Sequence, residues 1–167
     1  MTTIVFAHGL ESDPIGRKSQ AIIDAGYHVI APDGRGLDLG ARIPRILEAL
    51  EGVDPPPVLV GSSFGGIGGL IAAIMASERG MTLPGLVLCA PALMLPPPPQ
   101  TVAQLSRPTR TIIIHGTRDD IIPIDVSRAF AREHGAELRE VDDDHRLSEA
   151  GLPPMLEAVA ELAGPPK

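Results

Sequence analysis

The stretch Val58-Leu59-Val60-Gly61-Ser62-Ser63-Phe64-Gly65-Gly66 contains the pattern G-x-S-x-G at Gly61, Ser63 and Gly65. An apolar run precedes the pattern and a long apolar segment, residues 64–78, follows it, as in a strand that turns sharply into a helix. Small residues on both sides let strand and helix approach closely, and the dipole of a helix N-terminus favours negative charge beside it. The stretch predicts a buried strand that leads into a buried helix, with Ser63 as the candidate nucleophile at the turn.

Two nucleotide-binding patterns do not fit these glycines. G-x-G-x-x-G running through Gly66 and Gly68 would need a glycine at Ile71, and the phosphate loop needs a lysine that the stretch lacks. Two alternatives stay open. A glycine-rich turn could simply pack a helix on a sheet, and Ser62 is a second serine, although it occupies the wrong slot of the motif.

Short apolar runs alternate with segments of helical periodicity along the rest of the chain. The strand candidates are residues 3–7, 28–31, 58–60, 86–89, 111–114 and 137–141. The helix candidates are residues 15–25, 44–50, 64–78, 124–134 and 154–162. Most strand runs are apolar on both faces, which is typical of strands covered by helices on both sides, and the more polar last run suits a sheet edge. This alternation predicts an α/β fold of about six mostly parallel strands with helices on both faces, in one domain spanning residues 1–167.

Composition narrows the classes of partner. The net charge of −7 argues against nucleic acid, because binding to phosphates needs a basic surface. The single cysteine, Cys89, excludes an internal disulfide. No apolar stretch reaches the roughly 18 residues of a membrane span, and the N-terminus resembles a strand more than a signal peptide. We therefore expect a cytoplasmic protein that acts on a small molecule; the oligomeric state is not predicted.

A serine nucleophile needs a histidine base. Of the five histidines, His145 follows three aspartates in a polar loop between the last strand and the last helix. That loop opens at the carboxyl edge of a parallel sheet, the edge at which the Ser63 turn also lies. His145 is therefore the candidate base, with a solvated histidine in an acidic loop as the alternative.

The carboxylate that orients the base should come from another strand end at the same edge. Asp119 and Asp120 follow the strand at residues 111–114. Asp119 is favoured because Ile121, Ile122 and Pro123 should anchor the loop behind it, and Asp120 remains the rival. The order serine, aspartate, histidine along the chain is the one expected when the nucleophile is the central serine of a G-x-S-x-G turn.

A tetrahedral oxyanion needs backbone N–H donors. The residue after the nucleophile, Phe64, is one candidate donor, and Leu10, in the loop after the first strand, is the other. An ordinary strand-end turn at His8-Gly9 is the alternative to this oxyanion role.

With these residues placed, the chain resembles the capless members of the α/β-hydrolase superfamily over residues 4–162. The resemblance rests on five motifs in order along the chain: His8-Gly9, Pro32-Asp33-Gly34-Arg35-Gly36, the Gly61–Gly66 stretch, His115-Gly116-Thr117-Arg118-Asp119, and Asp144-His145. Residues 7–14 and 18–20, with the double serine, are more loosely similar to small bacterial esterases of the YqiA type.

The resemblance implies a serine hydrolase that cleaves carboxylic esters or thioesters through an acyl-enzyme, with a triad of Ser63, Asp119 and His145 and with neither cofactor nor metal. It also implies a minimal α/β-hydrolase fold without the first two of the usual eight strands. Residues 94–110, where many relatives insert a helical lid, are short and proline-rich, so no lid is expected. An acyltransferase on the same triad and a non-catalytic binding protein of the same fold are the alternatives.

Overall fold

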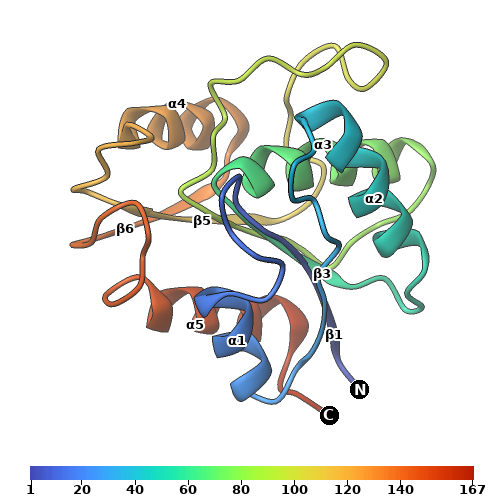
Figure 1. The fold of residues 1–167 in the computed structure, drawn as a ribbon, viewed down its shortest axis with the longest axis horizontal. Helices are drawn as coiled ribbons and strands as arrows, with labels where there is room; N and C mark the ends of the chain where they lie inside the picture. The colour runs from blue at the N-terminus through green and yellow to red at the C-terminus, as the bar shows by residue number, and fades with distance from the viewer.

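A single six-stranded sheet runs through the computed structural model, which describes all 167 residues (Figure 1). The strands are β1 (Thr3–Ala7), β2 (His28–Ile30), β3 (Val58–Ser62), β4 (Leu86–Cys89), β5 (Thr111–Gly116) and β6 (Glu137–Val141). The helices are α1 (Arg17–Asp24), α2 (Leu39–Glu51), α3 (Phe64–Glu78), α4 (Ile124–His134) and α5 (Leu152–Ala163). Their spatial order is β2-β1-β3-β4-β5-β6, and every neighbouring pair is parallel. The predicted fold class is confirmed.

Helices cover the sheet on both faces, with α2, α3 and α4 on one side and α1 and α5 on the other (Figure 1). Alternate residues of β1 divide between these layers: Val5 packs into the core under α2, α3 and α4, whereas Ile4 and Phe6 pack into the core over α1 and α5. Because both faces are covered, the central strands contain almost only buried apolar residues, as the double-sided sequence pattern predicted.

Helix α2 begins five residues before the predicted start at Pro44. A start at Pro44 is locally acceptable, because the missing N–H of proline is harmless in the first turn of a helix. The structure instead caps the helix with Asp38, whose side chain accepts a hydrogen bond from the Ala41 N–H at 2.9 Å, so that Pro44 lies inside the helix. The early start also places Arg42 within α2, which matters for the site below.

The position of the last strand and the loop at residues 94–110 also agree with the sequence-based predictions. The polar strand β6 lies at one edge, beside β5. Residues 94–110 form neither helix nor strand, so the fold has no lid there.

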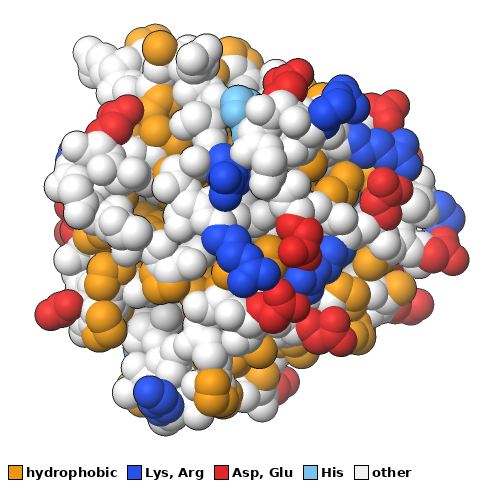
Figure 2. All heavy atoms as spheres, turned by 180° about the vertical axis from the view of Figure 1, so that it is seen from behind, with side chains coloured by type: hydrophobic (Ala, Val, Ile, Leu, Met, Phe, Trp, Pro, Cys, Tyr) orange, Lys and Arg blue, Asp and Glu red, His pale blue; other side chains and the backbone are white.

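No helix has the length and apolar character required to cross a membrane. Acidic and basic side chains alternate on the face shown in Figure 2, so the negative net charge is not gathered there into one acidic patch.

Candidate active site

Ser63 lies at the sharp turn between β3 and α3. Its backbone has φ 55° and ψ −111°, a left-handed conformation that costs a non-glycine residue on the order of 1–3 kcal/mol. Four backbone hydrogen bonds hold it there. Its N–H donates to the Cys89 carbonyl at 2.9 Å, and its carbonyl accepts from the N–H groups of Ala92 and Gly66, both at 3.0 Å, and from that of Ile67 at 3.4 Å. The chain after β4 therefore helps to impose the turn predicted from G-x-S-x-G.

The glycines on either side of Ser63 are required by close backbone approach. A Cβ at Gly61 would lie 2.6 Å from the Gly65 carbonyl oxygen, and a Cβ at Gly65 would lie 2.1 Å from the Ala7 carbonyl oxygen. Both distances are far below van der Waals contact, so only hydrogen atoms fit at these positions. The N-terminus of α3 can thus pack directly against the ends of β1 and β3.

His145 lies between Ser63 and Asp119. Its Nε2 is 3.0 Å from Ser63 Oγ, and its Nδ1 is 2.8 Å from Asp119 Oδ2. Because an ionised carboxylate only accepts hydrogen bonds, Nδ1 carries the proton and Nε2 is free to accept the serine proton. The Asp119 side chain is fully buried, whereas that of His145 is 20% exposed. The structure thus brings together the three side chains that the sequence pointed to.

The His145 loop between β6 and α5 is held from within by Asp143. This buried carboxylate accepts hydrogen bonds from the N–H groups of Asp144, Glu149 and Gly151 at 2.8, 3.2 and 3.0 Å. Burial alone would raise the pKa of Asp143, but these three bonds outweigh it and lower that pKa below its usual value. From outside, the Lys18 ammonium of α1 donates to the Arg146 carbonyl at 2.5 Å.

Asp119 is held from several directions, unlike its neighbour Asp120. Asp119 Oδ1 accepts hydrogen bonds from the N–H groups of Ile121 and Ile122 at 2.9 and 2.8 Å. Its Oδ2 also lies 3.1 Å from Nε2 of the buried His115. Asp120 is exposed and forms no hydrogen bond through its side chain. Of the two adjacent aspartates, the structure places Asp119 against His145.

His115 is a buried histidine whose part in the site the sequence did not reveal. Its Nδ1 lies 2.7 Å from Ser127 Oγ, and its Nε2 lies 2.9 Å from the Ile122 carbonyl oxygen. Since a carbonyl accepts only, Nε2 carries the proton and Nδ1 accepts from the serine hydroxyl. The ring links β5, α4 and the loop that bears Asp119, and so fixes where that carboxylate lies.

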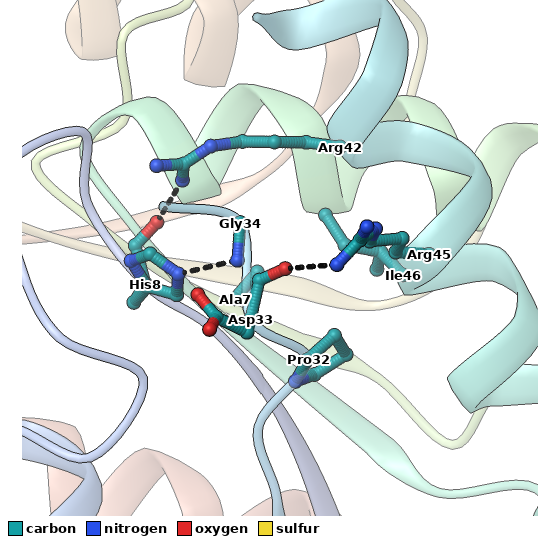
Figure 3. A pocket seen from close by; sticks show the side chains of 8 residues that line it. All are labelled: Ala7, His8, Pro32, Asp33, Gly34, Arg42, Arg45 and Ile46. Carbon is teal, nitrogen blue, oxygen red and sulfur yellow. Dashed lines mark hydrogen bonds between the residues drawn. The ribbon is translucent and has the colours of Figure 1, made fainter. Parts of the chain in front are cut away.

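The two candidate oxyanion donors are the backbone N–H groups of Phe64, at the start of α3, and Leu10, in the loop after β1. Phe64 is the first residue of α3, where an N–H has no acceptor within the helix. The N–H of Leu10 donates no backbone hydrogen bond. The Leu10 loop is anchored by His8, whose Nδ1 donates to the Gly9 carbonyl and whose Nε2 accepts from the Gly34 N–H, both at 2.8 Å (Figure 3). Burial lowers the pKa of His8, so the neutral ring that this network needs is the stable form.

Arg42 is the most unusual charged residue beside the site, and sequence reasoning missed it. Its guanidinium is almost fully buried and lies above His8 (Figure 3). It donates to the carbonyl of His8 at 2.7 Å and, more weakly, to those of Gly9 and Leu10 at 3.2 and 3.4 Å. No local signal marked it, because the pattern of α2 shows only that position 42 faces inward.

No cluster of His, Cys, Asp or Glu in the structure has the arrangement of a metal site.

Comparison with known proteins assigns the family. The chain matches the family described as the alpha/beta hydrolase family over residues 4–110, which is more than half of its length. The protein therefore belongs to the α/β-hydrolase family, in agreement with the predicted resemblance. The comparison with curated proteins found no match.

Solved structures with the same fold include several hydrolases. One from Xanthomonas campestris pv. campestris, described as a hydrolase of the alpha/beta superfamily, has 28% identity and a TM-score of 0.80, with 97% of this chain and 98% of that chain covered. Est1E from Butyrivibrio proteoclasticus, solved with ferulic acid, has 19% identity and a TM-score of 0.74, with 96% and 87% covered. A monoacylglycerol lipase from Paleococcus ferrophilus has 17% identity and a TM-score of 0.70, with 95% and 94% covered. At these identities, the last two demonstrate a shared fold alone.

Proposed function

We propose that the protein is a serine hydrolase that cleaves carboxylic esters or thioesters through an acyl-enzyme, with Ser63 as nucleophile, His145 as base and Asp119 as the acid that orients it. The observation that carries this proposal is the continuous hydrogen-bonded chain from Ser63 Oγ through His145 to Asp119, with distances of 3.0 and 2.8 Å. All three side chains extend from the carboxyl edge of one sheet, which supports the treatment of residues 1–167 as a single catalytic domain.

In the acylation step, Ser63 Oγ attacks the acyl carbonyl carbon while its proton passes to His145 Nε2. Negative charge then develops on the former carbonyl oxygen, where the Leu10 and Phe64 N–H groups are the proposed donors. Asp119 stabilises the imidazolium that forms and keeps its Nδ1–H in place. Collapse of the intermediate breaks the bond to the leaving alkoxide or thiolate, which takes the proton from Nε2.

In the deacylation step, water takes the place of the leaving group. His145 accepts a proton from this water as its oxygen attacks the acyl-enzyme, and the same two N–H groups stabilise the second oxyanion. Collapse returns the proton to Ser63 Oγ and releases the carboxylic acid. The absence of helix or strand in residues 94–110 leaves the site without a lid, which favours small or extended acyl groups over a closely enclosed substrate.

A fluorophosphonate probe and a p-nitrophenyl ester series from acetate to palmitate, run beside an acyl-thioester, test the proposal. The wild type should be labelled at Ser63 and should hydrolyse at least one member of the series. Ser63→Ala should abolish both, whereas Ser62→Ala, the matched change one residue away, should retain labelling. Labelling that survives in Ser63→Ala, or a wild type inert to both probe and esters, would count against the proposed function.

A further inference from the structure

A buried cation, Arg42, contacts three consecutive residues at the start of the loop that carries one proposed oxyanion donor. Arg42 is only 3% exposed, and all of its hydrogen bonds go to backbone carbonyls, those of His8, Gly9 and Leu10, with no carboxylate among them. Its Nε has no partner at all. A buried charge without a counter-ion is destabilising, because neutral carbonyls replace only part of its hydration. The burial of Arg42 is therefore explained better by a role in the site than by a contribution to stability.

The geometry of the Gly9–Leu10 peptide indicates that role. The Gly9 carbonyl and the Leu10 N–H belong to the same planar trans peptide, in which C=O and N–H point in opposite directions. Arg42 Nη2 at 3.2 Å and His8 Nδ1 at 2.8 Å both meet the Gly9 oxygen. Holding that oxygen on the Arg42 side directs the Leu10 N–H the other way. A hydrogen bond to the carbonyl also polarises the peptide and makes its N–H a stronger donor.

Arg42 also touches the residue that bears the second proposed donor. Its guanidinium carbon lies 4.9 Å from the centre of the Phe64 ring, within the range of a cation–π interaction. The stem of the same side chain packs against Gly34, where a Cβ would lie 2.9 Å from Arg42 Nε. The guanidinium is thus held between the loop after β2, the Leu10 loop and the first residue of α3.

We propose that Arg42 is a positioning residue for the oxyanion hole: it orients and polarises the Gly9–Leu10 peptide so that the Leu10 N–H is ready to bind the developing oxyanion. This inference rests on the proposed function. It assigns Arg42 no contact with the substrate, so its contribution should appear in the rate of the chemical step and not in ground-state binding.

The variants Arg42→Met, Arg42→Lys and Arg79→Met separate this role from a general loss of structure. Methionine keeps the apolar stem and removes the charge, while lysine keeps the charge but replaces the planar fork by a single ammonium. Arg79 is the control, since it is an exposed arginine at the end of α3 that donates to Glu51 Oε1 at 2.6 Å and contacts none of the residues of the Leu10 loop. The measurements are kcat and KM per fluorophosphonate-labelled site, and the inhibition constant of a trifluoromethyl ketone, which forms an oxyanion on the enzyme.

For Arg42→Met we expect kcat to fall on the order of 10²-fold, the usual effect of losing one oxyanion donor, with KM changed less than about threefold. The affinity for the trifluoromethyl ketone should fall by a similar factor. For Arg42→Lys, kcat and the affinity for the ketone should lie between those of Arg42→Met and the wild type, and Arg79→Met should match the wild type.

Two results would overturn the inference. One is an Arg42→Met variant whose kcat and ketone affinity lie within twofold of the wild type. The other, decisive if the methionine variant does not fold, is an Arg42→Lys variant with full kcat, because a single ammonium cannot replace the fork. In both cases the wild type remains active, which distinguishes failure of this inference from failure of the proposed function, where the wild type itself is inert.

Discussion

Replacing Gly65 by alanine puts a methyl group where the start of α3 meets the end of β1. The new Cβ would lie 2.1 Å from the Ala7 carbonyl oxygen and 2.4 Å from the His8 carbonyl oxygen. A carbon and a carbonyl oxygen normally stay about 3.3 Å apart, so helix and strand must separate by about 1 Å. Both obstructing atoms belong to the main chain and cannot rotate away, in contrast to the tip of a flexible side chain.

The energetic cost follows from this overlap. Overpacking of a well-filled core typically costs about 1–3 kcal/mol, and alanine recovers at most about 1 kcal/mol of helix propensity. Because the clash is with backbone, we expect a net loss near 2 kcal/mol for Gly65→Ala, which lowers Tm by roughly 4–8 °C in a protein of this size. The same displacement moves the Leu10 loop away from Ser63, and a misplacement of about 1 Å can cost on the order of 10²-fold in kcat.

Gly68→Ala is the matched control, one helical turn further along α3. A Cβ there would lie 3.3 Å from Ile46 Cδ1 and 3.5 Å from Leu39 Cδ1, both at the ends of flexible side chains. We expect this variant to be close to the wild type in Tm and in kcat, measured by thermal circular dichroism and p-nitrophenyl ester hydrolysis. If Gly65→Ala is as stable and as active as Gly68→Ala, then direct packing of α3 on the end of β1 does not shape the site.

The remaining predictions concern Asp143 and His8, two of the buried titratable groups that hold the site loops. The lowered pKa of Asp143 means that the folded protein favours the carboxylate, so its stabilisation is present above pH 3.8, the ordinary value, and is lost as the pH falls through the lower folded pKa. Asp143→Asn, which cannot accept all three backbone hydrogen bonds, should lower the free energy of unfolding at pH 7 by about 2 kcal/mol, and urea titrations should show that difference shrinking below pH 4; a constant difference would contradict the assignment. The pKa of His8 is lowered from 6.5, so only the unfolded chain binds a proton just below that pH and stability should fall as the pH drops from 7 to 5. His8→Gln should show a shallower fall of Tm over the same range, and an equal slope would mean that His8 does not contribute.

Local features of the chain were predictable from the sequence alone. The turn at Ser63 could be recognised because G-x-S-x-G is a pattern of neighbouring residues, and Gly61 is required by the Gly65 carbonyl within that stretch. The end of α4 at Gly135 followed from residue type, since a left-handed φ of 73° is easy only for glycine. The parallel sheet followed from apolar runs that alternate with helical segments, because strands buried on both faces are composed mostly of apolar residues.

The start of α2 and the choice between Asp119 and Asp120 depended on the tertiary structure. Proline locally favours the first turn of a helix, because inside a helix it removes a backbone hydrogen bond, so a start at Pro44 was the local expectation. In the structure, the packing of α2 on the sheet together with the Asp38 cap offsets that cost and extends the helix back to Leu39. Likewise, the sequence favoured Asp119 and left Asp120 as its rival, and in the structure the Ile121 and Ile122 N–H groups and the buried His115 hold Asp119 facing His145.

By itself, then, the sequence determined the fold class and the three strand ends from which Ser63, Asp119 and His145 extend, because periodicity and turn chemistry are properties of neighbouring residues. The hydrogen bonds that hold the loops around those side chains became apparent only in the tertiary structure. Arg42 reaches the His8 carbonyl across 34 positions of the chain, a contact that exists only once α2 packs beside β1. Hydrogen bonds between such distant residues depend on strand order and helix placement, and no local pattern of residues encodes them.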